Sequence, residues 1–139
     1  MARQRDFDQG VLDHYVDLRL KVRWNSTGLF ENRVWQFVVL VPRWLLTSGG
    51  REPICTAHDL RLIEDLLWRD FGGYTSMVSP VRGLGLRDQQ VEKNLHTQIT
   101  VLAARWRGTR RYFRALRREL EKCSGEKTIA IFRQELVIV

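Results

Sequence analysis

The chain has 139 residues, a size expected for one domain, and its 44% hydrophobic content, with five Trp, six Phe and three Tyr, excludes a disordered protein. No run reaches the roughly 20 apolar residues of a membrane span, and the first ten residues lack the apolar segment of a signal peptide. We therefore expect a cytoplasmic protein with no membrane partner.

The distribution of charge and the number of cysteines indicate which kinds of site the protein can have. The net charge is +7, and between Arg105 and Arg118 the chain carries seven Arg and no acidic residue, whereas 16 basic and 16 acidic residues lie outside that window. The chain has two cysteines, Cys55 and Cys123, so neither a disulfide framework nor a four-ligand zinc site is predicted. We expect reduced thiols, no metal and no cofactor.

The N-terminal part of the chain predicts a tail followed by strands. Residues 1–14 are polar and charged, typical of a flexible segment, and residues 15–139 are expected to form the single domain. From Tyr15 to Trp24 apolar and charged residues alternate, which predicts a strand with one face towards the core. After turn residues at 25–28, the run Arg33 to Val41 is apolar on both faces except for Gln36, as in a central strand that ends at Pro42. The first strand is expected to pair with this one or with another subunit.

The clearest signal is a helix with both ends marked in the sequence, over residues 57–71. Thr56 is a predicted N-cap, and Asp59, three residues later, can complete an acidic capping box. Apolar residues recur every three or four positions, which predicts one face packed on the core. Gly72 and Gly73 supply the left-handed conformation that ends a helix.

The remaining elements alternate between the periods of strand and helix. Trp44 to Pro53 is expected to be a loop, and Trp44 is the Trp expected to be exposed. Beyond the helix we expect an edge strand over Tyr74 to Leu86, a long strand over Asn94 to Trp106, a helix over 109–123 capped by Thr109, and a last strand over Lys127 to Val139.

This order predicts the fold class. Without the first strand it is β-α-β-β-α-β, which is the ferredoxin-like arrangement of an α+β protein, with two helices on one face of an antiparallel sheet of four or five strands. The strand over 15–24 would be an additional N-terminal strand.

The sequence Phe71-Gly72-Gly73-Tyr74-Thr75 closes a helix and precedes a glycine-containing strand, a polar turn and a long alternating strand. In this order and this motif, residues 34–139 resemble small bacterial ferredoxin-like proteins of the PII-like kind. The resemblance implies a fold. It implies no ligand, because the nucleotide-binding signatures of the PII proteins themselves are not visible here.

The Arg-rich stretch is the candidate binding site. Guanidinium groups match phosphate oxygens bidentately, and a cluster of them releases counterions when it binds nucleic acid. Arg110, Arg114 and Arg117 fall on one stripe of the second helix, opposite its apolar face. The full set is Arg105, Arg107, Arg110, Arg111, Arg114, Arg117 and Arg118. The alternative is a solvated helix face with no ligand.

Two other groups of residues are candidate sites. Arg82, Arg87 and Lys93 flank a glycine-containing strand and are a candidate ligand loop, although a bulged edge strand explains the glycines better. Cys55 and His58 lie within one turn of each other at a helix start, but no third group is evident to orient the histidine, so a small buried Cys is the favoured interpretation. The carboxylates of the first helix are expected on its surface in ion pairs.

The preferred function is a non-catalytic binding or regulatory module that recognises a phosphorylated small molecule or nucleic acid through the Arg-rich helix. One alternative is a small oligomeric enzyme that uses the open sheet face as a cavity, as dimeric αβ-barrel enzymes do, with His96, Gln98 and Gln36 as its polar strand residues. Another is a structural assembly protein without a small ligand. Because the open sheet face would be apolar, we expect a homodimer or homotrimer.

Overall fold

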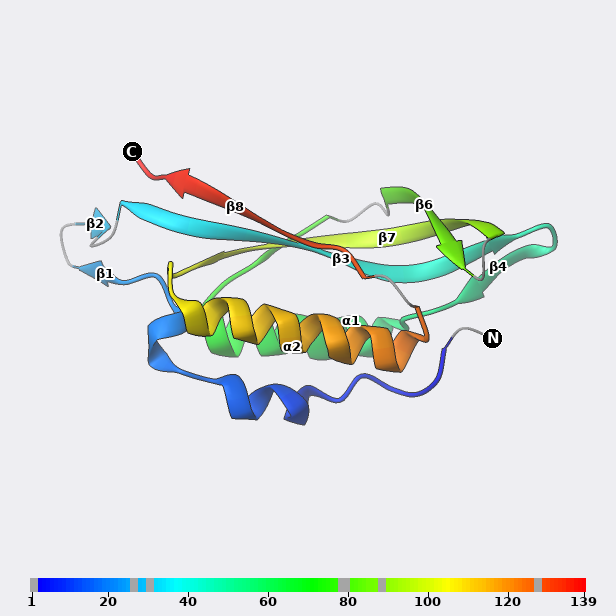
Figure 1. Cartoon of the computed structure of the whole chain (residues 1–139), viewed down its shortest axis with the longest axis horizontal. Helices are drawn as coiled ribbons and strands as arrows, with labels where there is room; N and C mark the ends of the chain where they lie inside the picture. Colours follow the sequence, from blue (N-terminus) through cyan, green and yellow to red (C-terminus); the bar gives the residue numbers. More distant parts are fainter. Residues whose placement is uncertain (1–2, 26–27, 30–31, 78–80, 88–89, 127–128) are drawn as a thin grey trace.

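The protein is α+β and antiparallel in its sheet, as predicted. The computed structural model describes residues 3–25, 28–29, 32–77, 81–87, 90–126 and 129–139, with the backbone alone described for 24–25, 28–29, 81–87 and 90–92. Two α-helices cover one face of the sheet, and the N-terminal segment runs along the side of the helices that faces away from the sheet (Figure 1). The described part of the chain thus forms three layers.

Two long strands form the centre of the sheet. Strand β3 (Arg33–Thr47) pairs antiparallel with β7 (Gln90–Ala103) along almost its whole length, from Trp35 opposite Ala103 to Leu46 opposite Lys93. On the helix side of β3, Phe37, Val39 and Val41 are buried, and the residues between them are half-buried. The central position expected for this strand is therefore confirmed.

Each central strand is flanked by two shorter strands, one after the other along its length. Strands β8 (Ile131–Val137) and β4 (Gly50–Pro53) pair with the two ends of β3, and β5 (Thr75–Ser76) and β6 (Val81–Arg87) pair with the two ends of β7. The described sheet thus has six strands, all antiparallel. A separate short pair joins β1 (Trp24–Asn25) to β2 (Gly28–Leu29).

Pro42 does not end its strand, and the loop predicted over 44–53 is wrong. The chain passes Pro42 with a shift of register between Pro42 and Trp44, and a bulge of this kind accommodates a proline inside a sheet. Residues 44–47 then pair with residues 50–53 in a hairpin, in which Gly50 takes a positive φ of 131°. Trp44 is half-buried, and the guanidinium carbon of Arg51 lies 4.8 Å from its ring centre. The most exposed described Trp is Trp68 on the first helix, at 64%.

The first helix, α1 (Ala57–Phe71), has both of the predicted ends. The Thr56 hydroxyl accepts from the N–H of Asp59, and the Asp59 carboxylate accepts from the N–H of Thr56, which completes the capping box. Gly72 ends the helix with a φ of 80°, a conformation that favours glycine. These signals are local, which is why the sequence alone was sufficient to locate them.

The second helix, α2 (Arg107–Ser124), begins two residues earlier than predicted. Its N-cap is Trp106, and the predicted cap Thr109 lies inside the first turn, where its hydroxyl donates to the carbonyl of Ala104 at 2.9 Å. The Trp106 ring folds back over Gly108, at which a Cβ would lie 2.0 Å from the ring. The helix therefore needs a glycine at this position.

The strand predicted over 15–24 is wrong. A 3-10 helix, η1 (Gln9–Tyr15), ends where this strand was expected to begin, and a second one, η2 (Leu18–Leu20), lies within the segment. The side chains of Asp8 and Asp17 cap them by accepting backbone N–H groups. Among the apolar residues that suggested a strand face, Leu20 is fully buried, whereas Leu18 is 88% exposed. The alternation therefore does not mark a common face, and the sheet has no additional N-terminal strand here.

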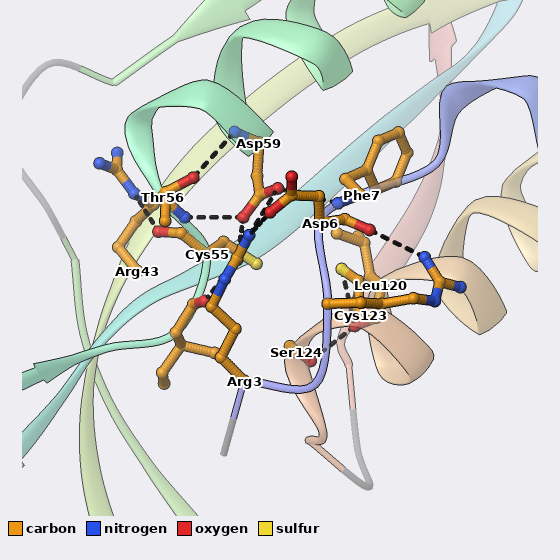
Figure 2. Close-up of polar contacts among 12 residues, drawn as sticks. Arg3, Asp6, Phe7, Arg43, Cys55, Thr56, Asp59, Leu120, Cys123 and Ser124 are labelled. Atoms are coloured by element: carbon orange, nitrogen blue, oxygen red, sulfur yellow. Dashed lines mark hydrogen bonds and ion pairs between the residues drawn. The ribbon is translucent and has the colours of Figure 1, made fainter. Parts of the chain in front are cut away.

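Residues 3–14 are packed, where a flexible segment was expected. Phe7 and Leu12 belong to the core. The Arg3 guanidinium contacts the Asp59 carboxylate, which also accepts from the N–H of Phe7 at 2.8 Å (Figure 2). Asp59 is fully buried, so the prediction that it lies on the helix surface is wrong. Its ion pair with Arg3 fixes the N-terminal segment to the start of α1.

A second buried carboxylate fixes the same segment to α2. Both guanidinium NH₂ groups of Arg5 donate to the Glu119 carboxylate at 2.6 Å, and the N–H of Asp8 donates to it at 2.8 Å. Glu119 is 1% exposed. The segment therefore lies against both helices and closes the side of the helical layer that faces away from the sheet.

Candidate anion-binding site

Helix α2 presents its Arg residues to solvent and its aromatic residues to the sheet. Tyr112, Phe113 and Leu116 are buried, which fixes the rotation of the helix. Every Arg on α2 is exposed, and these are Arg107, Arg110, Arg111, Arg114, Arg117 and Arg118. The predicted division of the helix into a basic face and an apolar face is therefore confirmed.

One side of this basic face forms a wall of a pocket against the sheet. The pocket has a volume of about 270 Å³ and is lined by Arg110, Arg114 and Arg117 from α2, Arg133 and Ile131 from β8, and the rings of Phe37 and Phe113. We refer to this cavity as the Arg pocket. The three Arg residues of the predicted stripe thus line one cavity, joined by a fourth Arg from a strand.

The floor of the Arg pocket is made of packed aromatic rings. Phe37 and Phe113 stack with their centres 3.9 Å apart and their planes 10° from parallel, and both are almost fully buried. Phe71 also stacks on Phe113, with their ring centres 5.2 Å apart. Because these rings are fixed by the core, the guanidinium groups stand at the edge of a rigid apolar surface.

Among the described residues, no acidic one lines the Arg pocket. Arg117 has a carboxylate within 3.6 Å, that of Glu121 one turn along the helix. Within the described parts of the chain, Arg110 and Arg114 have no ion-pair partner. Four like charges around one small cavity repel one another, and a bound anion relieves that repulsion.

Arg133 is the site residue that the sequence analysis missed. It lies directly opposite Phe37 in the pairing of β8 with β3, so both side chains are on the helix side of the sheet. Its guanidinium carbon is 4.5 Å from the ring centre of Trp35, a cation–π contact that orients the side chain. The pairing register of β8 brings Arg133 to the helix stripe, and this register is not readable from a single sequence.

The other members of the predicted cluster lie outside the pocket. Arg105 precedes the helix and pairs with Glu135 at 3.2 Å. Arg118 donates to the Tyr15 hydroxyl at 3.4 Å, on the side of α2 that faces the N-terminal segment. Arg107 and Arg111 are exposed and are not among the lining residues. The predicted cluster of seven is therefore divided by the fold.

The candidate ligand loop is at the other end of the sheet. Arg82 and Arg87 are on β6, which pairs with the first half of β7, and Lys93 is exposed and pairs with Leu46. Leu46 is nine residues from Phe37 along β3, which corresponds to about 30 Å. The structure does not bring these residues to the Arg pocket, so one small ligand cannot contact both places.

Cys55 and His58 do not form a reactive pair. Cys55 is 1% exposed and His58 is exposed, so the two side chains are in different environments. The neighbouring Cys123 thiol and burial raise the pKa of Cys55, which is the opposite of the shift that activates a thiol. The favoured interpretation of a small buried Cys agrees with this placement.

A second cavity, of about 490 Å³, lies on the open face of the sheet. Gln36, Thr100 and Leu102 from the central strands line it. The rest of the described lining is Leu136 from β8, Val22 from the N-terminal segment, and residues 71–75, which run from the end of α1 to the start of β5. His96 and Gln98, the other polar residues proposed for this face, are not in its lining. Its described lining contains no carboxylate, imidazole or thiol, and the Tyr74 side chain is the titratable group in it.

Comparison with known proteins adds no family to this geometry. The chain matches no protein-family model, and neither a curated protein nor a solved structure is significantly similar to it. Among the described residues, no group of His, Cys, Asp and Glu is arranged to hold a metal ion, and no helix is long and apolar enough to cross a membrane. The Arg pocket is therefore the feature from which we infer a function.

Proposed function

We propose that the protein is a non-catalytic binding module that holds the phosphate groups of a small ligand in the Arg pocket. The single observation that supports this most is the convergence of Arg110, Arg114, Arg117 and Arg133, from a helix and a strand, on one cavity whose described lining has no acidic residue. A solvated helix face would spread its charges over the surface and would have no counterpart on the neighbouring strand.

The size of the pocket favours a phosphorylated small molecule over nucleic acid. Its volume of about 270 Å³ is slightly below the range of roughly 300 to 1,000 Å³ that is usual for ligand pockets. Nucleic acid needs a row of cations along the backbone and aromatic rings that are free to stack on bases. Phe37 and Phe113 are buried and stack on one another, so their rings are not free to stack on bases.

The ferredoxin-like arrangement also belongs to this proposal. The strand order β8-β3-β7-β5 supports it, because α1 connects the β3–β4 hairpin to β5 across β7, and α2 connects β7 to β8 across β3. The PII-like relationship and the cytoplasmic location stay predictions. We further propose a homo-oligomer, because Phe132 on β8 is 57% exposed and Leu102 on β7 is 37% exposed on the open face.

The test compares two charge reversals on the same helix. Arg114→Glu changes the Arg pocket, and Arg111→Glu makes the same change of charge on an exposed residue outside it. Calorimetric titration with inorganic pyrophosphate should give binding to the wild type and to Arg111→Glu, and a loss of at least about tenfold for Arg114→Glu, since a charge-assisted contact contributes roughly 1.5–3 kcal/mol.

A labelled single-stranded oligonucleotide separates the two ligand classes. If nucleic acid is the ligand, the oligonucleotide binds more tightly than pyrophosphate, and Arg111→Glu weakens it as much as Arg114→Glu does. If neither probe binds at low salt, where electrostatic contacts are strongest, the proposal is rejected and the Arg residues are a solvated face.

A further inference from the structure

Strand β8 is at the edge of the sheet, and one side of its backbone is unpaired in the described structure. The N–H of Leu40 donates to the carbonyl of Ala130 at 3.1 Å, and the N–H of Ile138 donates to the carbonyl of Asn32 at 2.7 Å. Backbone groups alternate in direction along an antiparallel strand. The even-numbered residues of β8 therefore bond to β3, and the N–H and C=O groups of residues 131, 133, 135 and 137 point outwards.

The sequence of β8 is symmetric in residue type about its middle. It reads Ile-Phe-Arg-Gln-Glu-Leu-Val, with Gln134 at the centre. Two copies paired antiparallel about Gln134 place Arg133 of each copy opposite Glu135 of the other. The same pairing places Phe132 opposite Leu136 and Ile131 opposite Val137, so apolar side chains meet on both flanks of the charged pairs.

Neighbouring registers are unfavourable. The outward backbone groups of the two strands meet only when odd-numbered residues face odd-numbered residues. The twofold axis that relates the two strands therefore passes through a residue and not between two residues. An axis through residue 133 puts two Arg side chains directly opposite each other, and an axis through residue 135 does the same with two Glu side chains. Like charges in directly opposite positions destabilise a strand pair, whereas opposite charges stabilise it. The axis through Gln134 is therefore the favoured one.

The side chains that would meet are exposed in the single chain. Phe132 is 57% exposed and Val137 is 63% exposed, while Ile131 and Leu136 are half-buried, so four apolar side chains with free surface lie along this one strand. An exposed apolar edge with free backbone groups pairs readily with another strand. Charge, apolar contacts and backbone direction thus agree on the same partner, which is a second copy of this chain.

We propose that two copies of the protein associate through β8, with the two strands antiparallel and a twofold axis at Gln134. The two sheets then form one continuous sheet with all helices on the same face. Arg133 borders both the new contact and the Arg pocket, so the two pockets lie on either side of the axis. That last consequence rests on the proposed function, whereas the strand pairing does not.

Exchange of the two charges tests the pairing without any ligand. In Arg133→Glu alone, the introduced carboxylate meets the partner's Glu135, and in Glu135→Arg alone two Arg side chains meet. We expect the wild type to be a dimer at micromolar concentration and each variant to dimerise about tenfold more weakly or worse, because two like-charged pairs replace two opposite pairs. Mixing the two variants restores opposite charges in both positions.

The mixture is therefore expected to form heterodimers, which native mass spectrometry distinguishes from homodimers by mass. A monomeric wild type, or variants that each dimerise as well as the wild type, would overturn the proposal. So would a mixture that stays monomeric. Glu135→Arg also removes the pair with Arg105, but both side chains are nearly half exposed, so little stability is lost.

A cysteine on the axis provides an independent measurement. Gln134 bonds to β3, so the two Gln134 residues would form a non-hydrogen-bonded pair with Cα atoms about 4.5 Å apart, within the range of about 4.4–6.8 Å for disulfides. Gln134→Cys should give a covalent dimer under mild oxidation in phosphate-free buffer. Thr47→Cys, exposed at the tip of the β3–β4 hairpin, is the control. Equal cross-linking of the two variants, or none, contradicts the pairing whether or not the Arg pocket binds anions.

Discussion

Removal of the Arg5 side chain is expected to destabilise the whole protein, although Arg5 is near the N-terminus and partly exposed. Its guanidinium makes two contacts of 2.6 Å with Glu119, a carboxylate that is 1% exposed. In Arg5→Ala the N–H of Asp8 is the one donor left to this carboxylate among the described residues. A buried charge would then be largely uncompensated.

The magnitude follows from the burial of the two partners. Removing one member of a fully buried ion pair costs about 3–5 kcal/mol. Arg5 is 42% exposed, so water replaces part of the lost interaction, and we expect a loss of about 2 kcal/mol in the free energy of unfolding. For a domain of this size the melting temperature should fall by roughly 8 °C.

Urea unfolding followed by Trp fluorescence measures this loss. Arg111→Ala is the matched control, because it removes an exposed Arg from α2 that has no ion pair in the described structure. The double variant Arg5→Met/Glu119→Leu should recover most of the stability, since it removes both charges together. An unfolding free energy of Arg5→Ala within about 0.5 kcal/mol of the wild type would refute this reasoning, as would a double variant less stable than the single one.

Three further predictions concern buried groups elsewhere. The Tyr112 hydroxyl donates to the buried Asp70 carboxylate at 2.6 Å, so Tyr112→Phe should lower the urea-unfolding free energy by about 1–2 kcal/mol, and no change would contradict that contact. Gly108→Ala forces the Trp106 ring to move and should cost about 1–3 kcal/mol, seen as a lower melting temperature. Burial opposes ionisation of Asp59, but its hydrogen bonds, above all to Arg3, hold its pKa below the ordinary value. Its stabilising effect is therefore present above about pH 4 and is lost as the pH falls through the lower folded-state pKa, and Asp59→Asn should weaken this acid dependence in urea titrations from pH 5 to 2.

The parts of the fold that were predicted correctly have local causes. The ends of α1 depend on Thr56, Asp59 and Gly72, which are within one turn of the positions they fix. The strand predicted over 15–24 is not formed, because the Asp17 side chain caps a 3-10 helix at Leu18–Leu20 and the alternating apolar residues do not share one face. The prediction that the strand ends at Pro42 is wrong, because a bulge beside this residue lets the strand continue.

The candidate site likewise has a part with a local cause, which the sequence predicted, and a part that depends on the whole fold. Arg110, Arg114 and Arg117 were predicted as one stripe, because helical spacing alone puts them on one side of α2. Arg133 depends on which strand pairs with β3 and in which register, and both are consequences of the whole chain. The distance to Lys93 and its neighbours on β6 is likewise set by the sheet, so the sequence could propose these residues but could not exclude them.

The most direct test of the Arg pocket is an NMR titration with inorganic pyrophosphate that follows the side-chain Nε–Hε signals of the Arg residues. Our account predicts that the signals of Arg110, Arg114, Arg117 and Arg133 shift together and saturate with one common binding constant. The signals of Arg107 and Arg111, exposed on the same helix but outside the pocket, should stay in place. Shifts spread evenly over all the Arg residues without saturation, or no shift at all, would contradict the existence of an anion-binding site in this pocket.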